Sequence, residues 1–105
     1  MKYSEIKKRM IDRGQTTELD LQLIEIVNAI KFAREDKKIT QVEIAEKTGM
    51  SQVQYSKFEN YYNRPTLETV VRVLNALDFD VANIFSMGIE QQINKGKQEK
   101  AVAHV

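Results

Sequence analysis

The feature that most constrains this chain is Gly49, which separates two short amphipathic segments in the middle of the sequence. Before the first segment, Thr40 and Glu43 are spaced as a capping box, in which each side chain satisfies a backbone amide near the other. Ser51 is a favourable N-cap for the second segment, which runs to about Glu59. Glycine supplies the positive φ angle that a tight turn demands. The sequence therefore predicts two short helices joined by a tight turn.

Helical signals continue on both sides of this pair. Thr17 is suited to cap a long helix from about Glu18 to Asp36. Asp80 predicts the start of a final short turn over Val81 to Phe85. Between them, Thr66 predicts the cap of a helix in which apolar residues recur at helical spacing and are expected to face inward: Leu67, Val70, Val71, Leu74 and Leu77.

The long predicted helix has more apolar residues than one contact face requires. One stripe, with spacings of three and four residues, is expected to be buried and consists of Leu19, Leu23, Ile26, Ile30 and Ala33. Leu21, Ile24 and Val27 lie off this stripe. We therefore expect a second cover for the helix, either a short helix over Ser4 to Arg13 or a second subunit.

Composition indicates one small all-α domain. The chain has 105 residues, one proline and four glycines, and 42% of its residues are hydrophobic. Residues 1–17 are expected to form an N-terminal extension, and residues 87–105 a flexible polar tail because they lack a sustained periodic face. No signal peptide or membrane span is expected, which favours a cytoplasmic protein.

An enzyme, a cofactor and a metal site are not expected. Cysteine is absent, which excludes disulfides, thiolate zinc sites and cysteine nucleophiles. The sole histidine, His104, is one residue from the end. The carboxylates are expected on solvent-exposed helix faces, where they would be ordinary surface charges. The formal net charge of +1 is far from that of a strongly basic nucleic-acid binder, so any DNA-binding interpretation has to rest on the arrangement of residues.

The segment from Gln41 to Glu59 has the helix-turn-helix arrangement and resembles the XRE, or Cro/cI-repressor, family. The matching residues are Gln41, Ala45, Gly49, Met50, Ser51, Phe58, Glu59 and Asn60. The likeness extends from about Ile26 to Phe85 and includes Arg34, Pro65-Thr66-Leu67 and Asn83-Ile84-Phe85. The resemblance implies a compact five-helix lambda-repressor-like DNA-binding domain over residues 18–86, in which Arg34 and Glu59 form a structural pair.

Three residues depart from the family pattern. Lys38 and Tyr61 stand where glycine is usual, at turns that often need positive φ, and a non-glycine residue there costs about 1 kcal/mol unless the turn is rebuilt. Tyr55 replaces a usual Ile or Val. Its hydroxyl is therefore expected to find a partner or to reach solvent.

The resemblance implies that the second helix of the motif lies in the major groove of double-stranded DNA. With Tyr55 and Phe58 taken as buried, a helical wheel places a polar edge on the opposite face. The residues expected to read bases are Gln52, Val53, Lys57 and, nearer the flank, Gln54. Those expected to contact the DNA backbone are Gln41, Ser51, Ser56, Asn60, Tyr62, Asn63 and Arg64.

These features favour a sequence-specific transcriptional repressor. A homodimer would bind a palindromic operator with half-sites roughly 34 Å apart. The main alternative is an antitoxin that represses its own operon while an extension neutralises a toxin protein. A module that kept the fold but binds only proteins is a third interpretation, because fold alone does not fix function.

Overall fold

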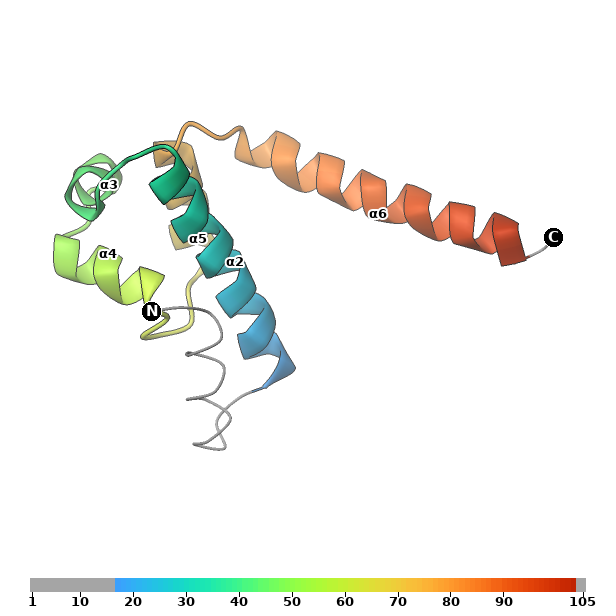
Figure 1. Ribbon diagram of the computed structural model, residues 1–105, viewed down its shortest axis with the longest axis horizontal. Helices are drawn as coiled ribbons and strands as arrows, with labels where there is room; N and C mark the ends of the chain where they lie inside the picture. The colour runs from blue at the N-terminus through green and yellow to red at the C-terminus, as the bar shows by residue number, and fades with distance from the viewer. Residues whose placement is uncertain (1–16, 104–105) are drawn as a thin grey trace.

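The computed structural model describes the backbone of residues 17–103 and the side chains of residues 17–97. This part of the chain is helical and contains no strand (Figure 1). The helices are α2 (Glu18–Asp36), α3 (Gln41–Thr48), α4 (Gln52–Glu59), α5 (Leu67–Ala76) and α6 (Val81–Ala103). The all-α fold class is thereby confirmed, whereas the helix expected over Ser4 to Arg13 lies outside the described residues.

Side-chain caps fix where the helices begin. Thr17 and Thr66 accept hydrogen bonds from backbone amides at the starts of α2 and α5, and capping boxes at Thr40 and Ser51 open α3 and α4. Gly49 has a φ of 75° and ends α3 in the left-handed conformation. These are the signals from which the helix starts were predicted, and all four N-caps are confirmed.

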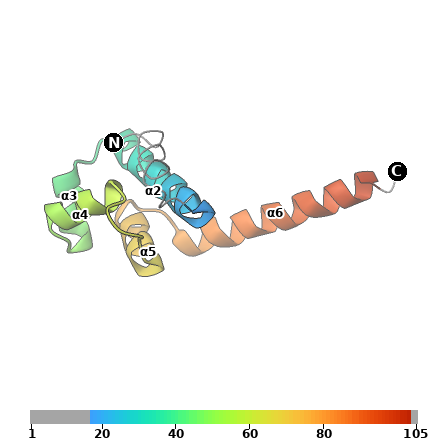
Figure 2. The ribbon, with the colours of Figure 1, turned by 90° about the horizontal axis from the view of Figure 1, so that it is seen from below.

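Helices α2 to α5 form one small body around a shared core (Figures 1 and 2). Tyr55 of α4 is fully buried at its centre, together with Ile44 of α3 and Val73 of α5. The other core residues are Ile24, Val27, Ile30, Ala45, Phe58, Tyr61, Val70 and Leu77. Burial of these side chains is the main favourable term that holds α3 and α4 in a fixed orientation.

The predicted inward face of α2 is rotated from the observed one. Leu19 and Ile26, expected inside, are 51% and 43% exposed. The buried positions are instead Asp20, Ile24, Val27, Ile30 and Arg34. Two apolar stripes lie side by side on this helix, so periodicity alone did not decide between them; the long-range ion pairs of Asp20 and Arg34 fix the rotation.

A similar correction applies to α5. Its buried face consists of Val70, Val73 and Leu77, whereas Leu67, which we expected to face inward, is 70% exposed. Val71 is only half-buried. Because the true face is centred on Val73, Leu67 in the first turn of the helix lies at its edge and reaches solvent.

The expectation of a short turn followed by a flexible polar tail is wrong for the described residues. Helix α6 begins at Val81 and continues without a break to Ala103, projecting from the body (Figure 1). Asp80 caps it by accepting a bond from the amide of Asn83 (3.2 Å). The polar residues that suggested a tail are mainly Glu, Gln and Lys, which are good helix formers. No helix among the described residues is long and apolar enough to cross a membrane.

The turns show how the chain accommodates the missing glycines. Lys38 and Tyr61 have φ values of 59° and 51°, so both turns keep the left-handed conformation and are not rebuilt. Asp78 is a third such residue, with a φ of 64°, which the sequence did not reveal. Each of these side chains carries the cost of a conformation that glycine adopts freely.

Candidate nucleic-acid interface

Helix α4 presents a polar edge on the side opposite the core. Gln52, Val53 and Lys57 are exposed, Val53 by 64%, while Tyr55 and Phe58 are buried beneath them. The outward orientation predicted for these side chains is confirmed. Their use in reading bases stays a prediction.

The start of α4 is held by its own side chains. The amide of Gln54 donates to Ser51 Oγ (3.1 Å), and the amide of Ser51 donates to Gln54 Oε1 (3.0 Å). Ser51 is therefore a cap, whatever else it contacts. The capping box occupies the carbonyl oxygen of Gln54 and leaves its amide nitrogen for other contacts, which agrees with a flanking place for this residue.

The loop after α4 extends the polar edge. Tyr62 is 71% exposed, and its ring lies 5.3 Å from Lys57 Nζ, a cation–π distance. Asn63 is exposed, and Asn60 Nδ2 donates to the Oγ of half-buried Ser56 (3.4 Å). A shallow hollow of about 230 Å³ lies between α4, this loop and the start of α5. Lys57 and the loop thus offer donors on one continuous surface.

A buried network fixes α4 to the two helices before it. Arg34 Nε of α2 donates to Glu59 Oε1 of α4 (3.0 Å), which confirms the predicted structural pair, and Arg34 Nη1 donates to the carbonyl of Ile39 (2.6 Å). Burial lowers the pKa of Arg34, but the hydrogen bond to Glu59 and the nearby negative charges together outweigh burial, and the net pKa is raised. The guanidinium is therefore charged at every relevant pH.

Gln41 is the third member of this network. Its Nε2 donates to the second carboxylate oxygen of Glu59 (2.8 Å), so the amide is oriented from the first helix of the motif by the end of the second. An amide nitrogen carries two protons, and the bond to Glu59 uses one of them. The remaining N–H is the group that could donate to a DNA phosphate.

Sequence reasoning missed a second long-range cluster, centred on Asp20. Arg64, predicted only as a DNA-backbone contact, pairs with Asp20 through Nε–Oδ1 (2.8 Å) and Nη2–Oδ2 (3.1 Å), although its side chain is 56% exposed. Tyr61 Oη also donates to Asp20 (2.6 Å). In the sequence, the one sign of this cluster is that the spacing of Asp20 and Arg34 places both on the same face of α2.

This cluster has a defined electrostatic character. The hydrogen bond from Arg64, followed by that from Tyr61, holds the pKa of Asp20 well below its usual range. Burial, with a further contribution from Asp20, raises the pKa of Tyr61 to about 12. The ion pair therefore persists at neutral pH and anchors the loop after α4 to the start of α2.

A short helix, a glycine turn and a second helix with an exposed polar edge define a helix-turn-helix protein of the XRE type, a class of DNA-binding regulators. A family model described as "Helix-turn-helix" matches residues 30–83, which is half of the chain. The chain belongs to this family.

Two curated relatives share a name, Antitoxin HipB. The protein of Escherichia coli strain K12 is 34% identical over 73 residues, a match that spans 65% of this chain and 83% of the relative. The protein of Escherichia coli O6:H1 is 33% identical over 73 residues, which spans 65% of this chain and 78% of the relative. No solved structure gives a significant match to the chain.

Proposed function

We propose that this protein is a sequence-specific transcriptional repressor that inserts α4 into the major groove of a palindromic operator. The observation that carries the proposal is the exposed edge of Gln52, Val53 and Lys57 on a helix whose opposite face is locked into the core. A reading helix has to be rigid, because base contacts require defined positions of the donors. The Arg34–Glu59–Gln41 network supplies this rigidity.

Each exposed side chain suits a different base. Gln52 can form a bidentate pair with adenine, and Lys57 can donate to the two acceptors of guanine. Val53 can contact the methyl group of thymine, and Gln54 lies close enough to the edge to assist. The proposed operator half-site therefore combines adenine, guanine and thymine contacts over a few base pairs.

Contacts to phosphate would fix the register of α4 on the duplex. The groups proposed for this role lie at the starts of α3 and α4, within α4 and in the loop after α4: Gln41, Ser51, Ser56, Asn60, Tyr62, Asn63 and Arg64. Arg64 could contact a phosphate while it remains paired with Asp20, since its guanidinium keeps N–H groups that the carboxylate does not use.

Selection of bound sequences from random DNA tests the proposal directly, because a dimeric repressor should recover an inverted repeat. Gln52→Ala is then expected to weaken binding to the selected site by roughly 10-fold to 100-fold, the usual effect of one bidentate base contact. Gln22→Ala, which changes an exposed glutamine of α2 on the side away from the core, is the matched control. Failure to select any sequence would contradict the proposal.

Salt dependence separates DNA binding from a pure protein-interaction module. A protein that neutralises several phosphates releases counterions, so its affinity falls steeply as the salt concentration rises. We expect a strongly negative slope of log K against log salt. Binding that is absent or independent of salt would favour the module.

An antitoxin role is the second candidate, and the two relatives named Antitoxin HipB favour it. In this role the chain would repress its own operon through α4 and would also bind a toxin protein. Co-purification of this chain with a small basic protein encoded by an adjacent gene tests the role. A gene that stands alone, with no such partner, would count against it.

A further inference from the structure

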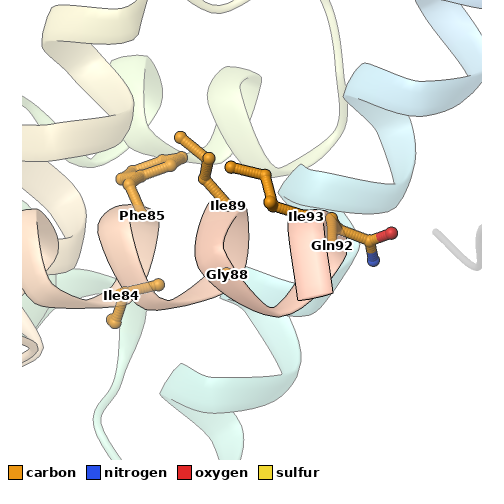
Figure 3. Close-up of a pocket in the computed structure, with 6 residues that line it drawn as sticks. All are labelled: Ile84, Phe85, Gly88, Ile89, Gln92 and Ile93. Atoms are coloured by element: carbon orange, nitrogen blue, oxygen red, sulfur yellow. The ribbon is translucent and has the colours of Figure 1, made fainter. Parts of the chain in front are cut away.

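Helix α6 carries an uncovered apolar stripe along one side (Figure 3). Phe85, Ile89 and Ile93 recur every four residues and are 42%, 60% and 52% exposed, and Ile84 beside them is 42% exposed. With Gly88 and Gln92 they line a shallow groove of about 460 Å³. A stripe of this kind on a helix that projects into solvent is typical of an interface.

The stripe continues onto the body of the protein. A second groove, of about 290 Å³, lies between α2, α5 and the start of α6, and Ile84 and Phe85 line both grooves. Its other lining residues are all apolar: Ile26, Ala29, Ile30, Ala33, Val70, Leu74 and Phe79. One apolar surface therefore runs from the body out along α6, and a partner that covers the helix would also reach the body.

The charges at the two ends of α6 are complementary. Asp78 and Asp80 are exposed just before its first residue, and Lys95 and Lys97 are exposed toward its far end. A parallel pair of α6 helices would place each lysine beside its own copy, whereas an antiparallel pair would place the lysines of one helix beside the aspartates of the other. Complementary charges favour one orientation even where they add little affinity.

The antiparallel register brings the open part of α6 to the crossing point. When Lys97 of one helix lies opposite Asp80 of the other, the midpoint falls between Gly88 and Ile89. A Cβ added at Gly88 would meet nothing within 4 Å, so the backbone is open to close approach at that point. Packed helices approach to about 8–10 Å between their axes, and a glycine favours the lower end of that range.

We propose that a second copy of this chain covers the stripe by pairing its α6 antiparallel to the first, crossing near Gly88. Ile93 of each copy then packs over Phe85 of the other and leads toward the groove on the body. The inference rests on the proposed function, in which the protein acts as a homodimer, and it assigns the dimer interface to α6. Helix α6 extends away from α3 and α4, so the pairing leaves the candidate DNA interface open (Figure 1).

Molar mass in solution, measured by sedimentation equilibrium on the full chain, tests the pairing. The unmodified chain is expected to form a dimer, and Ile89→Lys is expected to raise its dissociation constant by roughly 100-fold because the new charge would be buried without a partner. Met87→Lys is the matched control. Met87 is 48% exposed on the same helix but points to the opposite side, so this variant should stay dimeric.

Disulfide cross-linking tests the orientation, and the absence of native cysteine gives a clean background. Phe85→Cys mixed with Gln92→Cys should yield mixed cross-linked dimers, because the antiparallel register brings these two positions together on the facing sides of the helices. Gln92→Cys alone should not cross-link to itself. A cross-link of Gln92→Cys with its own copy would establish a parallel pair and overturn the proposal.

Two further outcomes would overturn the pairing but would not contradict the insertion of α4 into the major groove. One is a monomeric unmodified chain, including the case in which only an added toxin protein covers α6. The other is an Ile89→Lys variant that stays as dimeric as the Met87→Lys control. Binding to a single selected half-site is measured in parallel for the unmodified chain, Ile89→Lys and Met87→Lys. If none of the three binds DNA, that result would instead contradict the proposed function.

Discussion

The residue with the least expected environment is Tyr55. Its side chain is fully buried, and its hydroxyl has no hydrogen-bond partner among the described residues, so it neither finds a partner nor reaches solvent as the sequence had suggested. Burial raises the pKa of Tyr55 well above its usual range, and the nearby Glu59 carboxylate adds to this shift. An unsatisfied buried hydroxyl costs stability.

Replacing Tyr55 by phenylalanine is therefore expected to stabilise the protein. Tyr55→Phe removes the unsatisfied group and keeps the ring, so the free energy of unfolding should rise by about 1 kcal/mol in urea denaturation. Tyr61→Phe is the control, because it deletes a hydroxyl that donates to Asp20 and should be destabilising. Loss of stability in Tyr55→Phe would show that the hydroxyl has a partner in solution.

Arg34 supports both folding and the orientation of α4. Arg34→Ala leaves the Glu59 carboxylate, whose side chain is 1% exposed, without its charged partner. The free energy of unfolding should fall by about 3 kcal/mol, and affinity for the operator should fall with it. Arg72→Ala breaks only an exposed pair with Glu68 and should cost about 0.5 kcal/mol or less. Lost DNA binding with unchanged thermal stability would reject the structural role.

Asp20 makes stability depend on acid pH. Its folded pKa is lowered by Arg64 and Tyr61 relative to an unfolded value of about 3.9, so the unfolded chain takes up the proton first as the pH falls. The stabilisation is complete above about pH 5 and is lost as the pH drops below about 4 toward the folded pKa.

Urea denaturation at pH 7 and pH 3 measures this effect. The unmodified chain should lose more stability between these pH values than Asp20→Asn, which has no proton to take up at this site. Glu68→Gln, which alters an exposed pair, should keep the profile of the unmodified chain. Identical profiles for all three would show that Asp20 is not the responsible group.

At the scale of the elements, the turns after α2 and α4 share a left-handed residue but differ in what that residue does. Lys38 is exposed, so Lys38→Gly should relieve strain and raise the free energy of unfolding by about 1 kcal/mol. Tyr61 is buried and hydrogen-bonded to Asp20. Tyr61→Gly should therefore lower the free energy of unfolding by about 2 kcal/mol, although it removes the same backbone strain. Thermal unfolding of both variants checks the opposite signs.

Helix starts could be predicted from the sequence because caps are local. Thr17, Thr40, Ser51 and Thr66 each bind an amide within three residues, so no tertiary information is needed. The rotation of α2 could not be predicted this way, since it depends on partners 25 to 44 residues away. The length of α6 was missed because its apolar stripe advances by four residues and is interrupted by polar side chains.

The same division holds for the candidate interface. The outward edge of α4 follows from one helix and its two buried aromatic residues, so the helical wheel located Gln52, Val53 and Lys57 correctly. The bond from Gln41 to Glu59 and the pair of Arg64 with Asp20 join different elements, and only the fold brings them together. The position of Arg64 in the sequence therefore predicted a phosphate contact but not its ion pair with Asp20.

At the scale of the whole molecule, α6 adds little to the stability of the body that it extends. Val81 in its first turn is buried, whereas positions 82–95 are exposed. A chain ending at Ser86 should therefore unfold as a compact body at nearly the same temperature as the monomeric full chain, because it retains every core side chain.

The same truncation should change how unfolding depends on protein concentration. If the full chain dimerises through α6, dissociation is coupled to unfolding, and its midpoint temperature rises with concentration. The chain ending at Ser86 and the Ile89→Lys variant should both have a midpoint independent of concentration, while Met87→Lys should follow the unmodified chain. Both monomeric forms should still bind a half-site with salt-dependent affinity but lose cooperative binding to the inverted repeat. A truncated chain whose midpoint still rises with concentration would place the dimer surface on the body instead.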